Sequence, residues 1–359
     1  MRVVFYTNNV SPHQLPVARE VMRRVGRENF LYVGEEIAWN GRTIDAGEVQ
    51  TCTADSPRAR EWLENAEVMY TGGLRPIDLL ELRTKRGLAS LYCSERWFKP
   101  VPLFDLRLFG RMISAMAPGW VRLLVPGYRR MAKRFVSLAN ENACVRFLPI
   151  GPWARRDFLR LGVRSDKLVD WGYFVERGRG KGEEGRGSDE STILKVLWVG
   201  RVLGLKRVDT IIRAVKSVGG MSCTIVGDGP ELPWLRRLAQ GYDAIRFLPS
   251  QPNVRARELM RGHDLYVFAS DAQEGWGAVV SEALEEGMSV LGTFESGASA
   301  AMLPRERLFR AGDWKALAEL LRRERRGELP RCGIGDWTAT KAAERLLACV
   351  AAEDEGGLR

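Results

Sequence analysis

The feature that most constrains the fold is a regular alternation of short apolar segments and amphipathic segments over residues 194–292. The apolar segments predict strands at 194–199, 222–226, 245–248, 264–269 and 289–292. The segments between them have helical spacing and predict helices at 208–218, 232–240, 254–261 and 278–286. Strands that alternate with helices form a parallel sheet covered on both faces. Such sheets bind ligands in the loops at the carboxyl ends of their strands.

A similar alternation in the first half of the chain predicts a second doubly wound, Rossmann-like domain. Its expected elements are strands at 2–6, 30–33, 67–71 and 89–93, helices at 14–26 and 77–87, and a strand and turn at 170–175. Residues 177–191 are rich in glycine and charge and have no apolar side chain, which favours a flexible linker, with a lid over a cleft as the alternative. The expected domains are therefore 1–176 and 192–335. A helix and tail follow at 336–359, and a crossing of this segment back to the first domain stays open.

Composition limits the class of protein. A chain of 359 residues with 45% hydrophobic residues can form two globular domains. The six cysteines stand singly and there are two histidines, so we expect neither a zinc site nor a need for disulfides. The start of the chain lacks the pattern of a signal peptide, and no apolar stretch approaches the ~18 residues of a membrane-spanning helix. These features favour a cytoplasmic protein.

Positive charge is concentrated in one region. The net charge is +10, and residues 96–134 contain nine basic residues but one acid, Asp105. Such a region attracts phosphates, anionic lipid or nucleic acid, although a solvated helix face is the plainer interpretation. No RNA-binding, zinc-finger or helix-turn-helix pattern favours nucleic acid. Residues 121–135 have a loosely amphipathic helical pattern, so peripheral membrane association and packing on the protein's own domain both stay open.

The most informative motif begins with Glu274 and ends with Glu282. Gly275 and Gly277 let the loop after a strand turn and approach a ligand closely. The helix that follows has unpaired amides in its first turn, which can bind a phosphate. The two carboxylates can accept hydrogen bonds from sugar hydroxyls, whereas the alternative is a helix-start acid and a solvated helix residue.

Two further loops follow strands of the same half. In the first, Gly200 precedes Arg201 and Lys206, a planar cation and a mobile one that can both bind a diphosphate. Its spacing does not fit a Walker loop, and a basic surface turn is the alternative. In the second, Gly227 and Gly229 flank Asp228, without the last glycine of a dinucleotide-binding fingerprint.

Together these motifs resemble the GT-B glycosyltransferases, in particular the large family 4 of retaining enzymes. The resemblance covers residues 194–302 and includes GRVLGLKRVDTIIRAV, TIVGDGPELPWLRRLA and DLYVFASDAQEGWGAVVSEALEEGMSV. The E-x7-E pattern of Glu274 and Glu282 is its most specific part. The resemblance implies an α/β fold in which two Rossmann-like domains, both doubly wound, face each other across a cleft.

The resemblance also implies roles for matching residues. Arg201 and Lys206 would neutralise the diphosphate of a nucleotide-sugar donor, and Glu274 would hold the transferred sugar and Glu282 the ribose. Such enzymes need no metal or other cofactor and retain the anomeric configuration. Trp276 is the one tryptophan that we expect to contact the donor, by stacking on its sugar. UDP- and GDP-sugars cannot be distinguished.

The first half departs from the family pattern, and its candidates are weaker. His13 follows the first strand and could bind donor or acceptor hydroxyls or accept a proton, with a structural turn residue as the alternative. Glu95 and Arg96 follow a later strand and could contact the acceptor, or form an ordinary surface ion pair.

The sequence therefore favours a glycosyltransferase of glycan or polysaccharide biosynthesis that acts on a saccharide, lipid-linked or other hydroxyl acceptor. A sugar-nucleotide epimerase of the same fold and a non-catalytic protein that binds through its basic surface are the alternatives.

Overall fold

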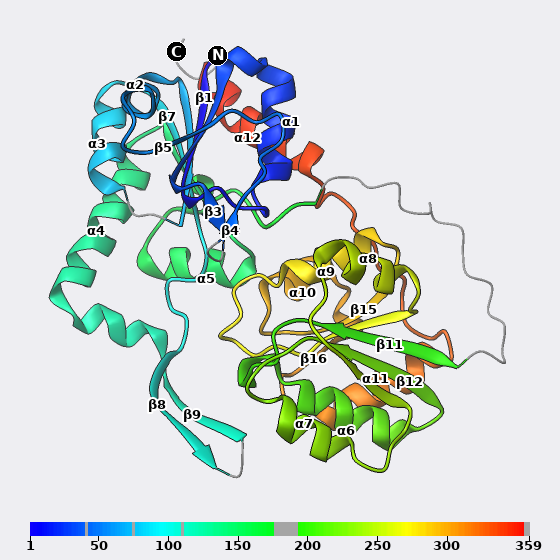
Figure 1. Ribbon diagram of the computed structural model, residues 1–359. Helices are drawn as coiled ribbons and strands as arrows, with labels where there is room; N and C mark the ends of the chain where they lie inside the picture. Colours follow the sequence, from blue (N-terminus) through cyan, green and yellow to red (C-terminus); the bar gives the residue numbers. More distant parts are fainter. Residues whose placement is uncertain (40–41, 74–75, 109–110, 176–192, 355–359) are drawn as a thin grey trace. The chain divides into compact units, whose positions relative to one another are not determined.

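The computed structural model describes residues 1–39, 42–73, 76–108, 111–175 and 193–354 (Figure 1). The chain forms two compact units. Unit 1 consists of Met1–Phe98, Trp120–Arg177 and Asp336–Arg359, and unit 2 of Lys99–Gly119 and Gly178–Gly335. These units differ from the expected domains at Lys99–Gly119, which groups with the second unit, and they group Asp336–Arg359 with the first. The expected linker at 177–191 lies outside the described residues.

Unit 1 contains a six-stranded parallel sheet in the order β10-β7-β6-β1-β2-β5. Its strands are β1 (Val3–Asn9), β2 (Phe30–Glu36), β5 (Thr51–Thr53), β6 (Val68–Gly72), β7 (Ala89–Ser94) and β10 (Val145–Pro149). A small antiparallel pair, β3 (Ala38–Trp39) and β4 (Arg42–Thr43), follows β2. Val3, Val4 and Phe5 are fully buried, as expected for a strand covered on both faces.

Helices cover both faces of this sheet (Figure 1). One face carries α2 (Pro57–Asn65), α3 (Ile77–Lys85), α4 (Pro126–Glu141) and α5 (Pro152–Leu161), and the other α1 (Leu15–Val25) and α12 (Ala339–Asp354). Short 3-10 turns lie at η1 (Arg27–Asn29), η2 (Gly119–Leu124) and η3 (Ser165–Lys167). Trp97 packs against Phe135 and Phe158 in the core, with ring centroids 5.5 and 5.8 Å away.

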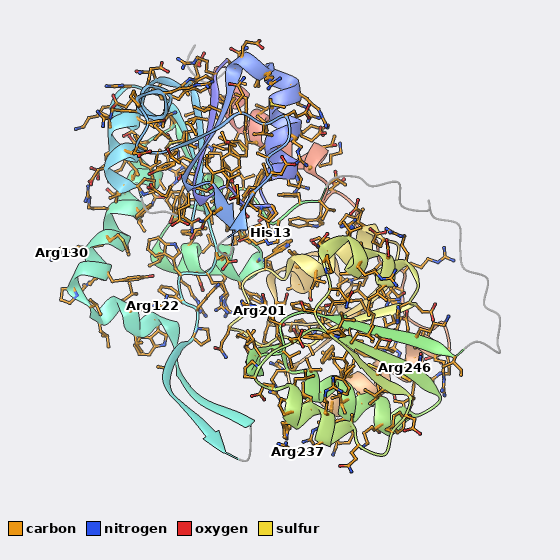
Figure 2. The ribbon with its side chains drawn as sticks, viewed as in Figure 1. His13, Arg122, Arg130, Arg201, Arg237 and Arg246 are labelled. Atoms are coloured by element: carbon orange, nitrogen blue, oxygen red, sulfur yellow. The ribbon has the colours of Figure 1, made fainter. Side chains whose placement is uncertain are left out.

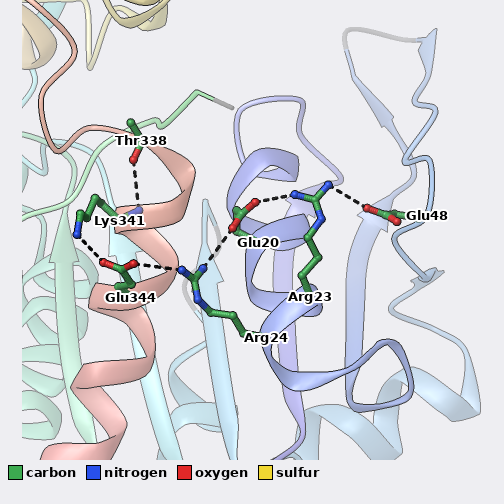
Figure 3. Close-up of polar contacts among 7 residues, drawn as sticks. All are labelled: Glu20, Arg23, Arg24, Glu48, Thr338, Lys341 and Glu344. Atoms are coloured by element: carbon green, nitrogen blue, oxygen red, sulfur yellow. Dashed lines mark hydrogen bonds and ion pairs between the residues drawn. The ribbon is translucent and has the colours of Figure 1, made fainter. Parts of the chain in front are cut away.

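The last helix completes unit 1 by packing beside α1 (Figure 3). Arg24 of α1 donates to Glu344 of α12 at 3.2 Å, and Lys341 lies 2.9 Å from the same carboxylate. The chain leaves and re-enters the unit at adjacent points, because Ala339 N donates to Val175 O at 3.0 Å and the rings of Phe174 and Trp337 stack 5.6 Å apart.

Unit 2 repeats the architecture, with the sheet order β13-β12-β11-β14-β15-β16. Its strands are β11 (Leu194–Val199), β12 (Met221–Val226), β13 (Ile245–Leu248), β14 (Leu265–Phe268), β15 (Ser289–Thr293) and β16 (Leu308–Phe309). One face carries α6 (Val208–Val218), α7 (Leu232–Ala239) and α11 (Trp314–Arg325), and the other α8 (Asn253–Arg261), α9 (Ala278–Glu285) and α10 (Gly297–Met302) (Figure 1). Short 3-10 turns lie at η4 (Gly204–Lys206) and η5 (Arg305–Arg307).

Three segments differ from the sequence-based expectations. Residues 101–117 form an antiparallel hairpin of β8 (Val101–Leu108) and β9 (Arg111–Ala117) that was not expected. Residues 121–135 are not one helix, because Pro126 starts α4 and the preceding turn is 3-10. Residues 170–175 form isolated bridges at Trp171 and Val175 and no strand.

A buried arginine connects three elements of unit 1. Arg83 of α3 is fully buried and donates to Leu63 O, Ala66 O and Ala89 O at 2.8–2.9 Å and to Ser90 Oγ at 3.0 Å. Burial lowers its pKa to about 10, so it stays charged at neutral pH. These bonds satisfy the carbonyls at the end of α2 and the start of β7.

We predict that Arg83→Ala destabilises unit 1 by about 3 kcal/mol or more, since three buried carbonyls and one hydroxyl lose their donor. Calorimetric unfolding of the whole chain measures the loss. Arg86→Ala, three residues later and with a side chain that is 41% exposed, is the matched control and should change stability little. Equal effects of the two variants would contradict the role of Arg83.

Candidate functional site

The loops at the carboxyl edge of the unit 2 sheet are joined by backbone hydrogen bonds. Gly200 N donates to Val226 O at 3.0 Å, and Val202 N donates to Asp228 O at 2.8 Å, so the loops after β11 and β12 lie against each other. Asp271 N donates to Leu205 O at 2.8 Å and joins the loop after β14. The three motif-bearing loops are therefore one connected surface, as parallel strand ends require.

Gly227 and Gly229 permit this contact by having no side chain. A Cβ on Gly227 would lie 1.9 Å from Gly200 O, and one on Gly229 would lie 2.3 Å from Val202 O. Both glycines also have positive φ, 141° and 157°. The two glycines therefore let the loops pack together beside the expected donor site, and their contact with the donor stays a prediction.

The cation and the acid of the two main motifs contact each other. Lys206 Nζ donates to Glu274 Oε2, and the two side chains are 19% and 20% exposed. Lys206 also lies 6.0 Å from the ring centre of Phe268 at the end of β14. Arg201 comes from the same loop and has an exposed side chain (Figure 2). A mobile cation and a carboxylate from separate loops thus meet at one point of the surface.

The Glu274 loop leads directly into α9. Gly277 caps this helix with φ 90°, and a Cβ there would lie 2.5 Å from the Phe268 ring. Within the described residues, no side chain accepts a hydrogen bond from the first-turn amides of α9. These amides can therefore bind an anion. Gly275 O accepts from Gly297 N at 3.1 Å, which fixes the loop against α10.

The expected sugar-stacking role of Trp276 is wrong. Its indole is 1% exposed and fills the interior beneath the loop, where Nε1 lies 3.4 Å from Ser281 Oγ. Its carbonyl accepts from Ser296 Oγ at 2.7 Å. Trp276 therefore stiffens the loop, and only its backbone can line a ligand site.

Glu282 lies in the second turn of α9. Its Oε1 accepts from Asn253 Nδ2 of α8 at 3.3 Å. Burial raises its pKa, while Arg257 and the Asn253 hydrogen bond act in the opposite direction. A half-buried carboxylate of this kind is a strong acceptor for vicinal hydroxyls.

Tyr266 of β14 is fully buried and connects β14 to β11. Its hydroxyl donates to Val199 O, at the end of β11, at 3.0 Å. Burial raises its pKa well above the ordinary value, and the charges of Glu282 and Glu274 raise it further.

A second group of polar residues lies at the carboxyl edge of unit 1. His13 follows β1 (Figure 2). Its ring stacks on that of Tyr173, with centroids 5.1 Å apart and planes 16° from parallel. Tyr173 Oη donates to Glu95 Oε1, after β7, at 3.1 Å. Burial lowers the pKa of His13, although the Glu95 carboxylate partly opposes this. His13 and Glu95 are therefore brought into one cluster.

Arg96 does not join this cluster. Its Nε lies 3.5 Å from Asp157 Oδ2, whose carboxylate is 2% exposed and also accepts from Phe98 N at 2.9 Å. Burial raises the pKa of Asp157, and Arg96 lowers it in part. The ion pair holds the loop after β7 on α5, so the structure favours a structural role for Arg96. The expected surface pairing of Glu95 with Arg96 is not observed, since each contacts another residue.

Four residues of these sites were not singled out in the sequence: Tyr173, Asn253, Tyr266 and Asp271. Tyr173 precedes the expected linker, and Asn253 starts a helix, so neither follows a strand in the pattern that marked the other candidates. Tyr266 stands inside an apolar strand, where a tyrosine is ordinarily core. Asp271 follows β14 and is the one that strand-end reasoning could have found.

The fold and the joined loops can be compared with those of known proteins. Over its whole length the chain resembles GT-B glycosyltransferases, with two Rossmann-like domains. It superposes on Anabaena HepE in complex with UDP with a TM-score of 0.63 at 15% identity, covering 100% of both chains. The lipopolysaccharide outer core galactosyltransferase WaaB gives 0.71 at 12% identity, covering 98% of this chain and 100% of that one. WaaG, a glycosyltransferase involved in lipopolysaccharide biosynthesis, gives 0.53 at 17%, covering 98% and 96%. These likenesses establish the GT-B fold.

A family match is found within the sequence of unit 2. Residues 186–325 match the family described as Glycosyl transferases group 1. No curated protein matches the chain. The resemblance to GT-B glycosyltransferases is thus confirmed, with the family match confined to this part of the chain, while membership of family 4 stays a prediction.

We predict that His13 titrates below the ordinary value of 6.5, because burial disfavours its charged form. In Glu95→Gln the midpoint should fall further, since a carboxylate that favours the charged form is removed. Imidazole NMR titration measures both midpoints, with His13→Gln to assign the signal. A midpoint above 6.5 in the wild type, or no change in Glu95→Gln, would contradict the cluster.

Proposed function

We propose that the chain is a glycosyltransferase that moves a sugar from a nucleoside-diphosphate sugar, bound by unit 2, to a hydroxyl acceptor. The observation that carries this proposal is the ion pair of Lys206 with Glu274 on the joined loops of the sheet edge. HepE is a structure in complex with UDP, and WaaB is a galactosyltransferase, which supports a nucleotide-sugar donor.

The donor would replace the ion pair by two separate contacts. Lys206 would move from Glu274 to the diphosphate, and Arg201 and the first-turn amides of α9 would add positive potential there. Glu274 would then accept hydrogen bonds from the transferred sugar, and Glu282 from the ribose. Charge on the departing diphosphate is stabilised in this way without a metal. We further propose retention of configuration, as in family 4.

Unit 1 would supply the acceptor contacts. His13 is held neutral by burial near neutral pH and can donate or accept a hydrogen bond, and Glu95 can accept from an acceptor hydroxyl. A saccharide or a lipid-linked saccharide fits these groups. Such an activity belongs to glycan or polysaccharide biosynthesis.

We predict that Lys206→Ala and Glu274→Gln each lower sugar transfer about 100-fold or more, the usual loss when a preorganised electrostatic contact is removed. Their effects on nucleoside diphosphate affinity should be opposite. Lys206→Ala removes a phosphate ligand and weakens binding, whereas Glu274→Gln releases Lys206 and strengthens it. Calorimetric titration with UDP and GDP measures affinity, and a donor-hydrolysis or transfer assay measures turnover.

Lys315→Ala, an exposed lysine of α11, is the matched control and should leave both quantities unchanged. Near-normal transfer in both site variants would contradict the mechanism.

Thermal-shift measurement with a panel of nucleotide-sugars identifies the donor, because a ligand at 100 times its Kd stabilises the protein by about 2.7 kcal/mol. Binding of donors without transfer, or interconversion of nucleotide-sugars without an acceptor, would favour the binding protein or the epimerase.

We also propose peripheral association of unit 1 with an anionic membrane surface. No helix in the described ranges has the length and apolarity to span a bilayer. The η2–α4 surface, however, exposes large apolar side chains beside basic ones: Trp120 (56%), Leu124 (74%), Val125 (58%), Arg129, Arg130 and Lys133. Apolar groups flanked by cations are suited to an interface between lipid headgroups and acyl chains. Arg122 and Arg130 lie on these elements in Figure 2.

We predict that wild-type protein floats with phosphatidylglycerol-containing vesicles and that a triple charge reversal at Arg129, Arg130 and Lys133 stops it, because each cation near such a surface contributes about 1 kcal/mol. Arg134→Gln is the control. Arg134 is already bound to Asp78 and Glu81, each at 2.8 Å, so its loss should not change flotation. Equal flotation of wild type and the triple variant would remove the membrane proposal.

A further inference from the structure

Two arginines of α8 in unit 2 bind the acids at the end of α9. Arg257 of α8 donates to Glu286 Oε1 at 2.6 Å and also to Glu285 Oε2. Arg261, one turn later, donates to Glu286 Oε2 at 2.8 Å. The two glutamate side chains are 7% and 6% exposed, so their charges are largely removed from water. Buried carboxylates require such partners, because an unpaired buried charge is strongly destabilising.

Glu282 belongs to the same row of acids. Residues three and four apart lie on one side of a helix, so Glu282, Glu285 and Glu286 are neighbours on α9. Asn253 of α8 donates to Glu282 at 3.3 Å. Burial raises the pKa of Glu282, Arg257 and the Asn253 hydrogen bond lower it, and the charges of Glu285 and Glu286 raise it. Like charges this close disfavour one another, and Arg257 is the cation they share.

We propose, on the basis of the proposed function, that Arg257 is a positioning residue for nucleotide binding. By binding Glu285 and Glu286, it keeps Glu282 available as an ionised acceptor for the ribose hydroxyls, and Asn253 sets the orientation of that carboxylate. Without Arg257, two buried charges next to Glu282 lose their main partner. Glu282 would then become protonated at higher pH and would accept hydrogen bonds from the ribose less strongly.

The test compares UDP with 2′,3′-dideoxy-UDP, and GDP with its dideoxy analogue, by calorimetric titration of the whole chain at pH 8 and pH 6. The ratio of the two Kd values reports the ribose contacts alone. In the wild type this preference should be about tenfold or more at both pH values, as expected for hydrogen bonds to a charged group. Arg257→Gln should reduce the preference severalfold at pH 6 and less at pH 8.

Three further variants separate positioning from folding. Arg257→Lys keeps the charge and should restore most of the preference at pH 6. Arg261→Gln removes the more exposed partner of Glu286 and should behave like the wild type. Asn253→Ala changes an exposed residue and should lower the preference at both pH values, whether or not Arg257→Gln folds.

The outcomes are distinct. An unchanged preference in Asn253→Ala and in any folded Arg257→Gln protein overturns the proposal, even if melting temperatures fall. Wild-type binding of UDP or GDP without a preference over the dideoxy form removes the ribose role of Glu282 and this inference with it, while the transferase proposal stands. Binding of neither nucleotide contradicts the proposed function itself.

Discussion

All six strands run parallel in each of the two principal sheets, and this constraint determines where chemistry can lie. Every loop that follows a strand reaches the same edge, so residues far apart in sequence meet there. In unit 2 this edge brings Lys206 to Glu274 across 68 positions of sequence. The two loops that carry this pair are held together by the hydrogen bond from Asp271 N to Leu205 O at 2.8 Å. The ion pair is thus a consequence of topology and of loop packing together.

Under the proposed function, the pairing favours a donor that carries both a diphosphate and a sugar. In the protein without donor, each satisfies the charge of the other, so neither is left uncompensated in a half-buried place. A ligand that carries both an anionic diphosphate and a hydroxyl-rich sugar can replace both partners at once. A ligand with only one of these groups leaves either Lys206 or Glu274 without a counterpart, which is a basis for selecting the intact donor.

The sequence predicts the helices and strands of unit 2 well, because apolar strand segments and amphipathic helix segments alternate regularly there. Each expected strand and helix between 194 and 292 is observed with bounds that differ by one or two residues at most. Hydrophobic patterning cannot show whether a particular aromatic side chain faces a ligand or the interior. For this reason the predicted stacking of Trp276 on a sugar is wrong, since its indole is buried. The hairpin at 101–117 was missed because its alternation is short and lies among basic residues that equally fit a charged surface. Tyr173 could not be found, because its role depends on where an irregular segment returns to the sheet.

The return of α12 to unit 1 has a consequence for synthesis. Unit 2 is complete once residue 335 has emerged from the ribosome, whereas unit 1 still lacks the helix that covers α1. Ala342, Ala343 and Leu346 of that helix are fully buried, so their partners on the first unit remain open to solvent until α12 has been synthesised. The later half of the polypeptide can therefore mature first, and the earlier half is the part that depends on a late-arriving segment and on chaperone protection in the meantime.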